Sequence, residues 1–341
     1  MAGIADLMNV PFGGTEAAAN ANPNRAKKLG YIRQEGVISL SFSRMETLHS
    51  CPRKFMLREL HERAAESPSI HLAFGSAFGA GMAELWRTNN IERAAVVALS
   101  HWDYDDWDNK YARGKSFGEC IRSLRLFHAN ILPQLAEEWE LAYIDGKPAI
   151  ELLFYIRISE TYDYQGHIDV ILKNKITNQL AVLECKTASK EQTSSNWQNS
   201  EQALGYYYTL QWLAQKLGLP AATEVIYLTL EVGKWSDPES NWGFKIFPFM
   251  QNEYSEAEFL GGLFSAIHTL DFFIEHKFFP KRGKACNAYG RTCEFFGACD
   301  FAMLTGETKD PTQVGNVYEV LHPSEADFYI DLTGKHPNAG T

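Results

Sequence analysis

The sequence contains no apolar run long enough to cross a membrane as a helix. Such a span needs about 18 or more consecutive apolar residues, and no stretch of this chain approaches that length. The N-terminal stretch MAGIADLMNVPFGG also lacks the charged start and apolar segment of an export signal. No internal repeat is visible. We therefore expect a globular, cytoplasmic protein with no membrane partner.

Positive charge is scarce. The chain has 32 Lys and Arg residues against 42 Asp and Glu residues, which gives a formal net charge of −10. This balance argues against adhesion to nucleic acid over the whole surface, although a local basic cleft is compatible with an acidic total. With 45% hydrophobic residues in 341, the chain can bury a sizeable core as one elaborated domain or two ordinary ones.

Cysteines are few, and their distribution is uneven. Of the six, Cys286, Cys293 and Cys299 fall within the single stretch ACNAYGRTCEFFGACD, and Cys51 lies more than two hundred residues upstream. Disulfides are not expected in a reducing compartment. Three clustered thiols are typical of a ligand set, and four thiolates suit either a [4Fe-4S] cluster or a structural zinc ion, with free core thiols as the remaining alternative.

The first predicted helix covers residues 41–60. Ser43 is expected at its N-cap, with Glu46 three residues later completing a capping box. Pro52 lies inside this stretch and predicts a kink or two short helices. Residues 1–36 are rich in Ala, Asn, Gly and Pro and are predicted to form a flexible arm.

The remaining pattern places three strands together, followed by a helix and further strands. Helices are predicted at residues 74–86, 117–141, 199–218 and 254–279, and strands at residues 149–159, 164–174, 179–189, 223–232 and 242–250. Three consecutive strands before a helix favour an α/β fold with a mixed sheet in the order αβββαβ, rather than a doubly wound parallel sheet.

The stretch LAVLECKTAS ends a predicted buried strand with Glu184 and Lys186. Residues two apart share one face of a strand, so Cys185 between them points to the core. Asp169 lies on the preceding strand with 14 residues between it and Glu184, and a hairpin can place the two carboxylates side by side. Mg²⁺ or Mn²⁺ between them would offset their repulsion. Lys186 could then position a metal-bound water or help to deprotonate it, although a simple ion pair at a strand end is the alternative.

This arrangement resembles the D…(D/E)xK core of the PD-(D/E)xK nuclease superfamily, with Asp169, Glu184 and Lys186 at the motif positions. Gln202 and Tyr206 resemble the Q-x-x-x-Y motif on the helix that follows the core in RecB-like exonucleases. Residues four apart share a helix face, so both side chains could reach the mouth of the site.

Two further stretches extend the resemblance over residues 41–300. SFSRMETLHSCPRKF is similar to the start of RecB, AddB and CRISPR-associated exonuclease domains. The split between Cys51 and the three late cysteines resembles the arrangement in which AddB-type nucleases hold an iron–sulfur cluster. The resemblance thus favours a [4Fe-4S] cluster over zinc at these four positions.

One position departs from the pattern. Relatives carry a G-s-x-x-H element before the core, its histidine being a metal ligand, whereas this chain has Gly79 at that position. Glu84 on the same predicted helix is a candidate substitute metal ligand, and an exposed place on the helix surface is its alternative.

The resemblance implies a Mg²⁺- or Mn²⁺-dependent deoxyribonuclease, an exonuclease acting in recombination, repair or phage DNA metabolism in a bacterial cell or phage-infected host. Asp169 and Glu184 would bind the metal, Lys186 would orient the attacking water, and Gln202 with Tyr206 would align the strand. The nuclease domain is expected at residues 37–300, followed by a C-terminal extension at 301–341.

Linear DNA or single-stranded DNA ends are the expected substrates, and a helicase or recombinase is a possible partner by analogy with relatives. Three lysines could supply positive charge near the site, namely Lys173, Lys175 and Lys190. The alternative function, supported by Gly79, is a catalytically inactive nucleic-acid-binding or scaffold protein that keeps the nuclease fold.

Overall fold

A computed structural model of the protein describes residues 36–60, 63–65, 69–104, 114–198, 200–232, 243–288, 291–299, 317–319 and 329–331. Almost all of the predicted N-terminal arm lies outside these residues. The chain divides into two compact units. Unit 1 is drawn from Met1–Ser67, Leu153–Gly166 and Leu260–Lys335, and unit 2 from Pro68–Leu152, His167–Phe259 and His336–Thr341.

Unit 2 contains a mixed sheet in the order β10-β9-β8-β7. The β8–β9 pair is parallel, and the β7–β8 and β9–β10 pairs are antiparallel. A short strand, β3, pairs with the C-terminal end of β7. The strands are β3 Trp139–Leu141, β4 Tyr143–Ile144, β5 Lys147–Pro148, β7 Tyr162–Asn174, β8 Leu180–Ala188, β9 Glu224–Glu231 and β10 Phe244–Met250.

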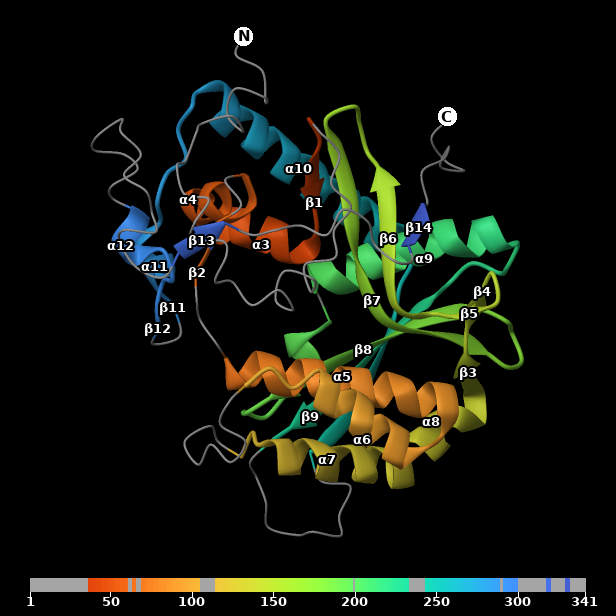
Figure 1. Ribbon diagram of the computed structural model, residues 1–341. Coiled ribbons are helices and arrows are strands. Elements are labelled where there is room, and N and C mark those ends of the chain that lie inside the picture. Colours follow the sequence, from red (N-terminus) through yellow and green to blue (C-terminus); the bar gives the residue numbers. More distant parts are fainter. Residues whose placement is uncertain are drawn as a thin grey trace. The chain divides into compact units, whose positions relative to one another are not determined.

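Helices α5, α6 and α7 lie together against one face of this sheet (Figure 1), where their apolar side chains and those of β7, β8 and β9 form one buried cluster. Helix α9 supplies groups that hydrogen-bond to the opposite face. The helical segments are α5 Ile70–Thr88, α6 Ile91–Ser100, α7 Phe117–Leu126, η4 Phe127–Ile131, α8 Leu132–Glu138, η5 Ser194–Asn196 and α9 Glu201–Leu217. Helix α9 ends at Gly218, whose left-handed φ of 63° suits a glycine C-cap, as predicted.

Unit 1 contains the N-terminal helices, the far ends of β6 and β7, and the segment that carries the late cysteines. There β6 lies beside β7, β1 pairs with β7, and β14 pairs with β6. Helix α10, Glu253–Glu275, runs from unit 2 into unit 1. The other elements are β1 Ile38–Leu40, α3 Phe42–Ser50, α4 Pro52–Phe55, η3 Met56–Leu60, β2 Arg63–Ala65, β6 Ile150–Arg157, α11 Gly283–Cys286, β11 Asn287–Ala288, β12 Arg291–Thr292, α12 Phe296–Cys299, β13 Val317–Glu319 and β14 Tyr329–Asp331.

Helix α10 is long and apolar enough in composition to cross a membrane, and it is the one such helix among the residues that the structure describes. Core helices of soluble proteins pass the same test, so this property is weak evidence for a membrane span.

Most predicted elements are confirmed, and two details of the prediction are wrong. The N-cap of α3 is Ser41, whose side chain accepts a hydrogen bond from Arg44 N–H, so the helix begins before the predicted Ser43 cap. Pro52 opens α4 at its first turn, which confirms the predicted break into two short helices. Residues Trp139–Leu141 form a strand beside β7 instead of ending a helix, because both apolar side chains become buried there.

Candidate active site and cysteine pocket

The sheet register of unit 2 places Asp169 beside Glu184. Val170 lies opposite Leu183 in the antiparallel β7–β8 pair, so the preceding residue of β7 lies opposite the following residue of β8. The backbone N–H of Cys185 also donates to Asp169 Oδ2 at 2.9 Å. The adjacency predicted from the hairpin is therefore present.

Both carboxylates occupy the sheet face opposite the helical core. Val170 and Leu183 pack into the apolar cluster with α5 and α7, and Cys185 packs against that cluster. Because side chains alternate along a strand, Asp169 and Glu184 point the other way. The inward position predicted for Cys185 is confirmed.

Lys186 is ion-paired with Glu184, two residues before it on β8. Its Nζ lies 2.5 Å from Glu184 Oε1. Burial acts to lower the pKa of Lys186, but attraction to Glu184 outweighs burial and raises that pKa. The ammonium group therefore stays charged, which suits a role in orienting water or phosphate and does not suit a role as a base.

Gln202 and Tyr206 on α9 form a hydrogen-bonded chain that ends on Glu184. Gln202 Nε2 donates to Glu184 Oε1 at 3.0 Å and to the Tyr206 hydroxyl at 2.7 Å. Tyr206 in turn donates to the His167 backbone carbonyl at 3.0 Å. Tyr206 is buried. Both side chains thus reach the site as predicted, and they hold Glu184 and β7 in place.

A third carboxylate, Glu151 on β6, belongs to this site and was missed by the sequence prediction. The N–H of Ile171 donates to the Ala149 carbonyl oxygen at 2.9 Å, so the start of β6 lies beside the part of β7 that carries Asp169. The charge of Glu151 acts on Asp169, and that of Glu184 acts on Glu151, so the three carboxyl groups lie close together. We call Glu151, Asp169 and Glu184 the carboxylate row. A lone glutamate in an otherwise apolar predicted strand was the available signal, but its left-handed backbone departs from regular strand geometry and cannot be read from the sequence.

The three carboxylates of the row repel one another. Burial, then the negative charges of Glu184 and Glu151, raise the pKa of Asp169 well above its ordinary value. Burial and the charge of Glu184 raise the pKa of Glu151 to about 7. Three carboxylates face one ammonium group, that of Lys186, so the row attracts further positive charge.

These side chains fit a divalent metal ion with a preference for oxygen ligands. Glu184 is 2% exposed, and its Oε2 has no hydrogen-bond partner. A buried, unsatisfied carboxylate oxygen is costly unless a proton or a cation occupies it. No three His, Cys, Asp or Glu side chains in the described part of the chain are gathered closely enough to form a complete metal site as they stand.

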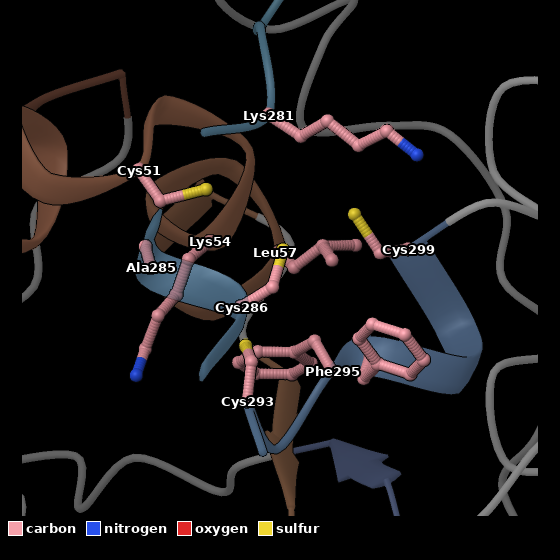
Figure 2. A pocket seen from close by; sticks show the side chains of 10 residues that line it. Cys51, Lys54, Leu57, Lys281, Ala285, Cys286, Cys293, Phe295 and Cys299 are labelled. Atoms are coloured by element: carbon pink, nitrogen blue, oxygen red, sulfur yellow. The ribbon is translucent and has the colours of Figure 1, made fainter. Parts of the chain in front are cut away.

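The four predicted cysteine ligands line one pocket in unit 1. Figure 2 shows them entering it from separate elements: Cys51 from the junction of α3 and α4, Cys286 from α11, Cys293 from the loop before α12, and Cys299 from α12. A backbone hydrogen bond from Cys293 N–H to the Cys286 carbonyl, 2.8 Å long, joins two of these segments. The structure thus brings together the thiols that the sequence separates by more than two hundred residues.

The wall of this cysteine pocket is apolar except for two cations. Leu57 and Phe295 are buried in it, and Lys54 and Lys281 also line it. Burial raises the pKa of the Cys293 thiol, and the positive charge of Lys54 opposes this shift only in part. Metal binding at the thiols of the pocket would therefore release their protons.

The family comparison covers most of the chain. The model of the PD-(D/E)XK nuclease superfamily matches residues 39–300, which include the whole carboxylate row and all four cysteines of the pocket. The chain belongs to the PD-(D/E)XK nuclease superfamily.

Among solved structures, this nuclease is similar to a crystal structure from Eubacterium rectale described as "Putative exonuclease". Their sequences are 10% identical, the match covers 81% of this chain and 92% of the other, and the TM-score is 0.44. A likeness this distant carries no functional conclusion. No curated protein matches the sequence.

The nuclease does not bring Glu84 to the carboxylate row. Arg87 donates to both carboxylate oxygens of Glu84 at 2.7 Å, and Arg93 donates to one of them at 3.1 Å. Glu84 is also buried instead of lying on an exposed helix surface. The expectation that it replaces the missing histidine at Gly79 is not supported, because two guanidinium groups already satisfy its charge.

Two of the three candidate lysines in the nuclease are engaged away from the row. Lys173 pairs with Glu140 at 2.7 Å, and Lys175 donates to the Ala136 carbonyl. Lys190 is exposed. Among the described lysines, Lys186 is thus the one shown to interact with the carboxylates.

Proposed function

We propose that this nuclease is a Mg²⁺- or Mn²⁺-dependent deoxyribonuclease that degrades DNA from its ends. The observation that carries the proposal is the placement of Asp169 beside Glu184 on one sheet face, with Lys186 two residues further along. A DNA phosphodiester is polyanionic, and the total charge of the protein is negative. The substrate must therefore be held at a focal site where a metal ion supplies the missing positive charge.

Asp169 and Glu184 would hold the divalent ion through carboxylate oxygens. When bound, such an ion stabilises negative charge on phosphate and makes water a better nucleophile. Lys186 remains protonated and donates hydrogen bonds, so it orients the attacking water or a phosphate oxygen. The proton lost by the water then passes to solvent or to a carboxylate of the row.

Gln202 and Tyr206 act as positioning residues in this proposal. Their polar groups are bonded to Glu184 and to the backbone of His167. They would fix the rotamer of the metal-binding carboxylate and the spacing of β7 and β8. The alignment of the DNA strand by these two residues stays a prediction.

We also propose that the cysteine pocket holds a [4Fe-4S] cluster, with structural zinc as the alternative. Four thiols, an apolar wall and two lysines suit a metal group that carries net negative charge. A role in recombination, repair or phage DNA metabolism, and a helicase or recombinase partner, remain predictions.

The nuclease proposal is tested by DNA degradation with Mg²⁺ on linear, covalently closed circular, and 5′- or 3′-labelled substrates. We expect the wild-type protein to degrade linear DNA and spare closed circles. Lys186→Ala should reduce the rate by about 100-fold or more, because a charge that acts on the transition state is lost.

Lys173→Ala is the matched control, since it removes a lysine from the same pair of strands without touching the carboxylate row. Equal degradation by wild type and Lys186→Ala would overturn the catalytic assignment. DNA binding without any Mg²⁺-dependent degradation by the wild type would favour the inactive binding protein instead.

A further inference from the structure

Glu151 lies close to Asp169 and Glu184, because hydrogen bonds between β6 and β7 bring it there, and the three carboxylates repel one another. Near the turn, Ile158 N–H donates to the Tyr162 carbonyl at 3.0 Å. At the other end, the bond from Ile171 N–H to the Ala149 carbonyl oxygen sets the start of β6 beside Ile171, so Glu151, two residues further along, lies near Asp169. The residue before Glu151, Ile150, packs against the same apolar cluster as Val170, which leaves Glu151 on the face of the carboxylate row.

The backbone of Glu151 is held in an unfavourable conformation. Its φ is +47°, in the left-handed region that residues other than glycine rarely adopt, although it lies within a strand. Strained residues of this kind persist where the surrounding structure demands them, and they concentrate at functional sites.

The carboxylate of Glu151 also has no bonding partner among the described residues. It makes no hydrogen bond or ion pair with any described residue. The residue as a whole is accessible to solvent, whereas its carboxyl group lies among protein atoms that raise its pKa. Its electrostatic interactions are repulsive and involve the other two members of the row. An unpaired carboxylate next to a buried unsatisfied one, Glu184 Oε2, has the chemistry of a cation ligand.

We propose that Glu151 is the third carboxylate of the metal centre, which supplies an oxygen from β6 to an ion that Asp169 and Glu184 hold from β7 and β8. The proposal rests on the proposed function, because it requires a divalent ion at that site. It assigns the third ligand to the strand next to Asp169, instead of to Gly79 or Glu84 on helix α5.

The test measures Mn²⁺ binding directly, by isothermal titration and by electron paramagnetic resonance of free Mn²⁺, in protein stripped of divalent ions. Glu151→Gln should weaken Mn²⁺ binding by about 10- to 100-fold, as loss of a group at a metal site typically does. Glu151→Asp keeps a carboxylate and should recover part of the affinity. Glu140→Gln, on β3, removes a glutamate from another strand that pairs with β7 and should bind Mn²⁺ as the wild type does.

The midpoint of thermal unfolding in metal-free protein distinguishes a purely structural role of Glu151 from a role in metal binding. Glu151→Gln relieves repulsion, and Glu151→Gly relieves the left-handed backbone as well, so both midpoints should equal or exceed that of the wild type at pH 8. Unchanged Mn²⁺ affinity in both variants, with binding lost in Asp169→Asn, would overturn the role of Glu151 and leave the proposed function standing. Lower midpoints together with weaker binding would also overturn it, and wild-type protein that binds no Mn²⁺ would overturn both proposals.

Discussion

Asp169 is the middle member of the carboxylate row, with Glu151 on one side and Glu184 on the other. It accepts one backbone hydrogen bond, from Cys185, which favours its charged form. Burial and the two neighbouring negative charges act more strongly in the opposite direction and raise its pKa. Without a metal ion, this residue is therefore a cost to folding, and such costs are common at functional sites.

This cost predicts the behaviour of Asp169→Asn in metal-free protein. The unfolded chain releases the Asp169 proton near its ordinary pKa of 3.8, whereas the folded protein retains that proton to higher pH. The folded state thus binds more protons, and the wild type loses stability as pH rises above that value. The variant should gain stability over the wild type as pH rises from about 4 to 8, by on the order of 1 kcal/mol at the upper end.

Thermal unfolding in a chelator at a series of pH values measures this difference. Below about pH 4 the carboxyl group is protonated in both states, so the two proteins should have similar midpoints there. Added Mg²⁺ should stabilise the wild type and leave the variant unchanged. A midpoint difference that does not depend on pH would contradict the repulsion inferred for the row.

At the scale of elements, helix α5 shows how close packing is built from small residues. Gly81 faces α6 and α7: a Cβ at this position would lie 2.6 Å from Leu124 Cδ1 and 3.2 Å from the Ala94 carbonyl oxygen. Leu124 is fully buried and cannot move aside freely. A Cβ added at Gly79, on the same helix, would have no atom within 4 Å.

These two glycines give a matched pair of substitutions. Gly81→Ala should destabilise the protein by about 1–3 kcal/mol, because the added methyl group overpacks the contact between the helices. Gly79→Ala should be neutral or should stabilise by up to about 1 kcal/mol, since alanine favours a helix. Denaturant unfolding of the two variants measures both effects, and equal stability of the two would show that α5 and α7 do not pack this closely.

Some of these elements could be predicted from the local sequence pattern, and others could not. Strands β7 and β8 each contain a buried apolar run and are joined by a short turn, so both their existence and their pairing could be predicted. The stretch 117–141 has one helical stripe in sequence, yet its last residues, Trp139–Leu141, form a strand. Pairing with β7 gives these residues their strand conformation, and such pairing depends on a segment that is distant in the sequence.

At the scale of the whole molecule, the cysteine pocket joins distant parts of unit 1. Cys51 lies in its first segment, and Cys286, Cys293 and Cys299 lie in its last. A metal group bound by all four would close a loop of more than two hundred residues. Such a link restricts the unfolded chain and so favours the folded one.

Cys299→Ser is therefore expected to lose the metal and to lower the free energy of unfolding by roughly 2–4 kcal/mol. Anaerobically purified wild type should contain iron and absorb at about 400 nm. Cys120→Ala removes a buried cysteine of α7 that does not line the pocket, and this variant should keep the iron. Stoichiometric zinc without iron in the wild type would establish the zinc alternative.

The sequence by itself placed Asp169 and Glu184 on neighbouring strands, with Glu184 and Lys186 on one face, and placed Gln202 and Tyr206 on one helix face. The resemblance to nuclease motifs singled these residues out as the predicted site. Only the tertiary structure decided the position of Glu151, the arginine partners of Glu84 and the gathering of the cysteines in one pocket. The physical reason is the range of the interactions. Alternation and helical period act over a few residues, whereas strand register, ion pairing and pocket formation depend on which distant segments the folded chain brings together.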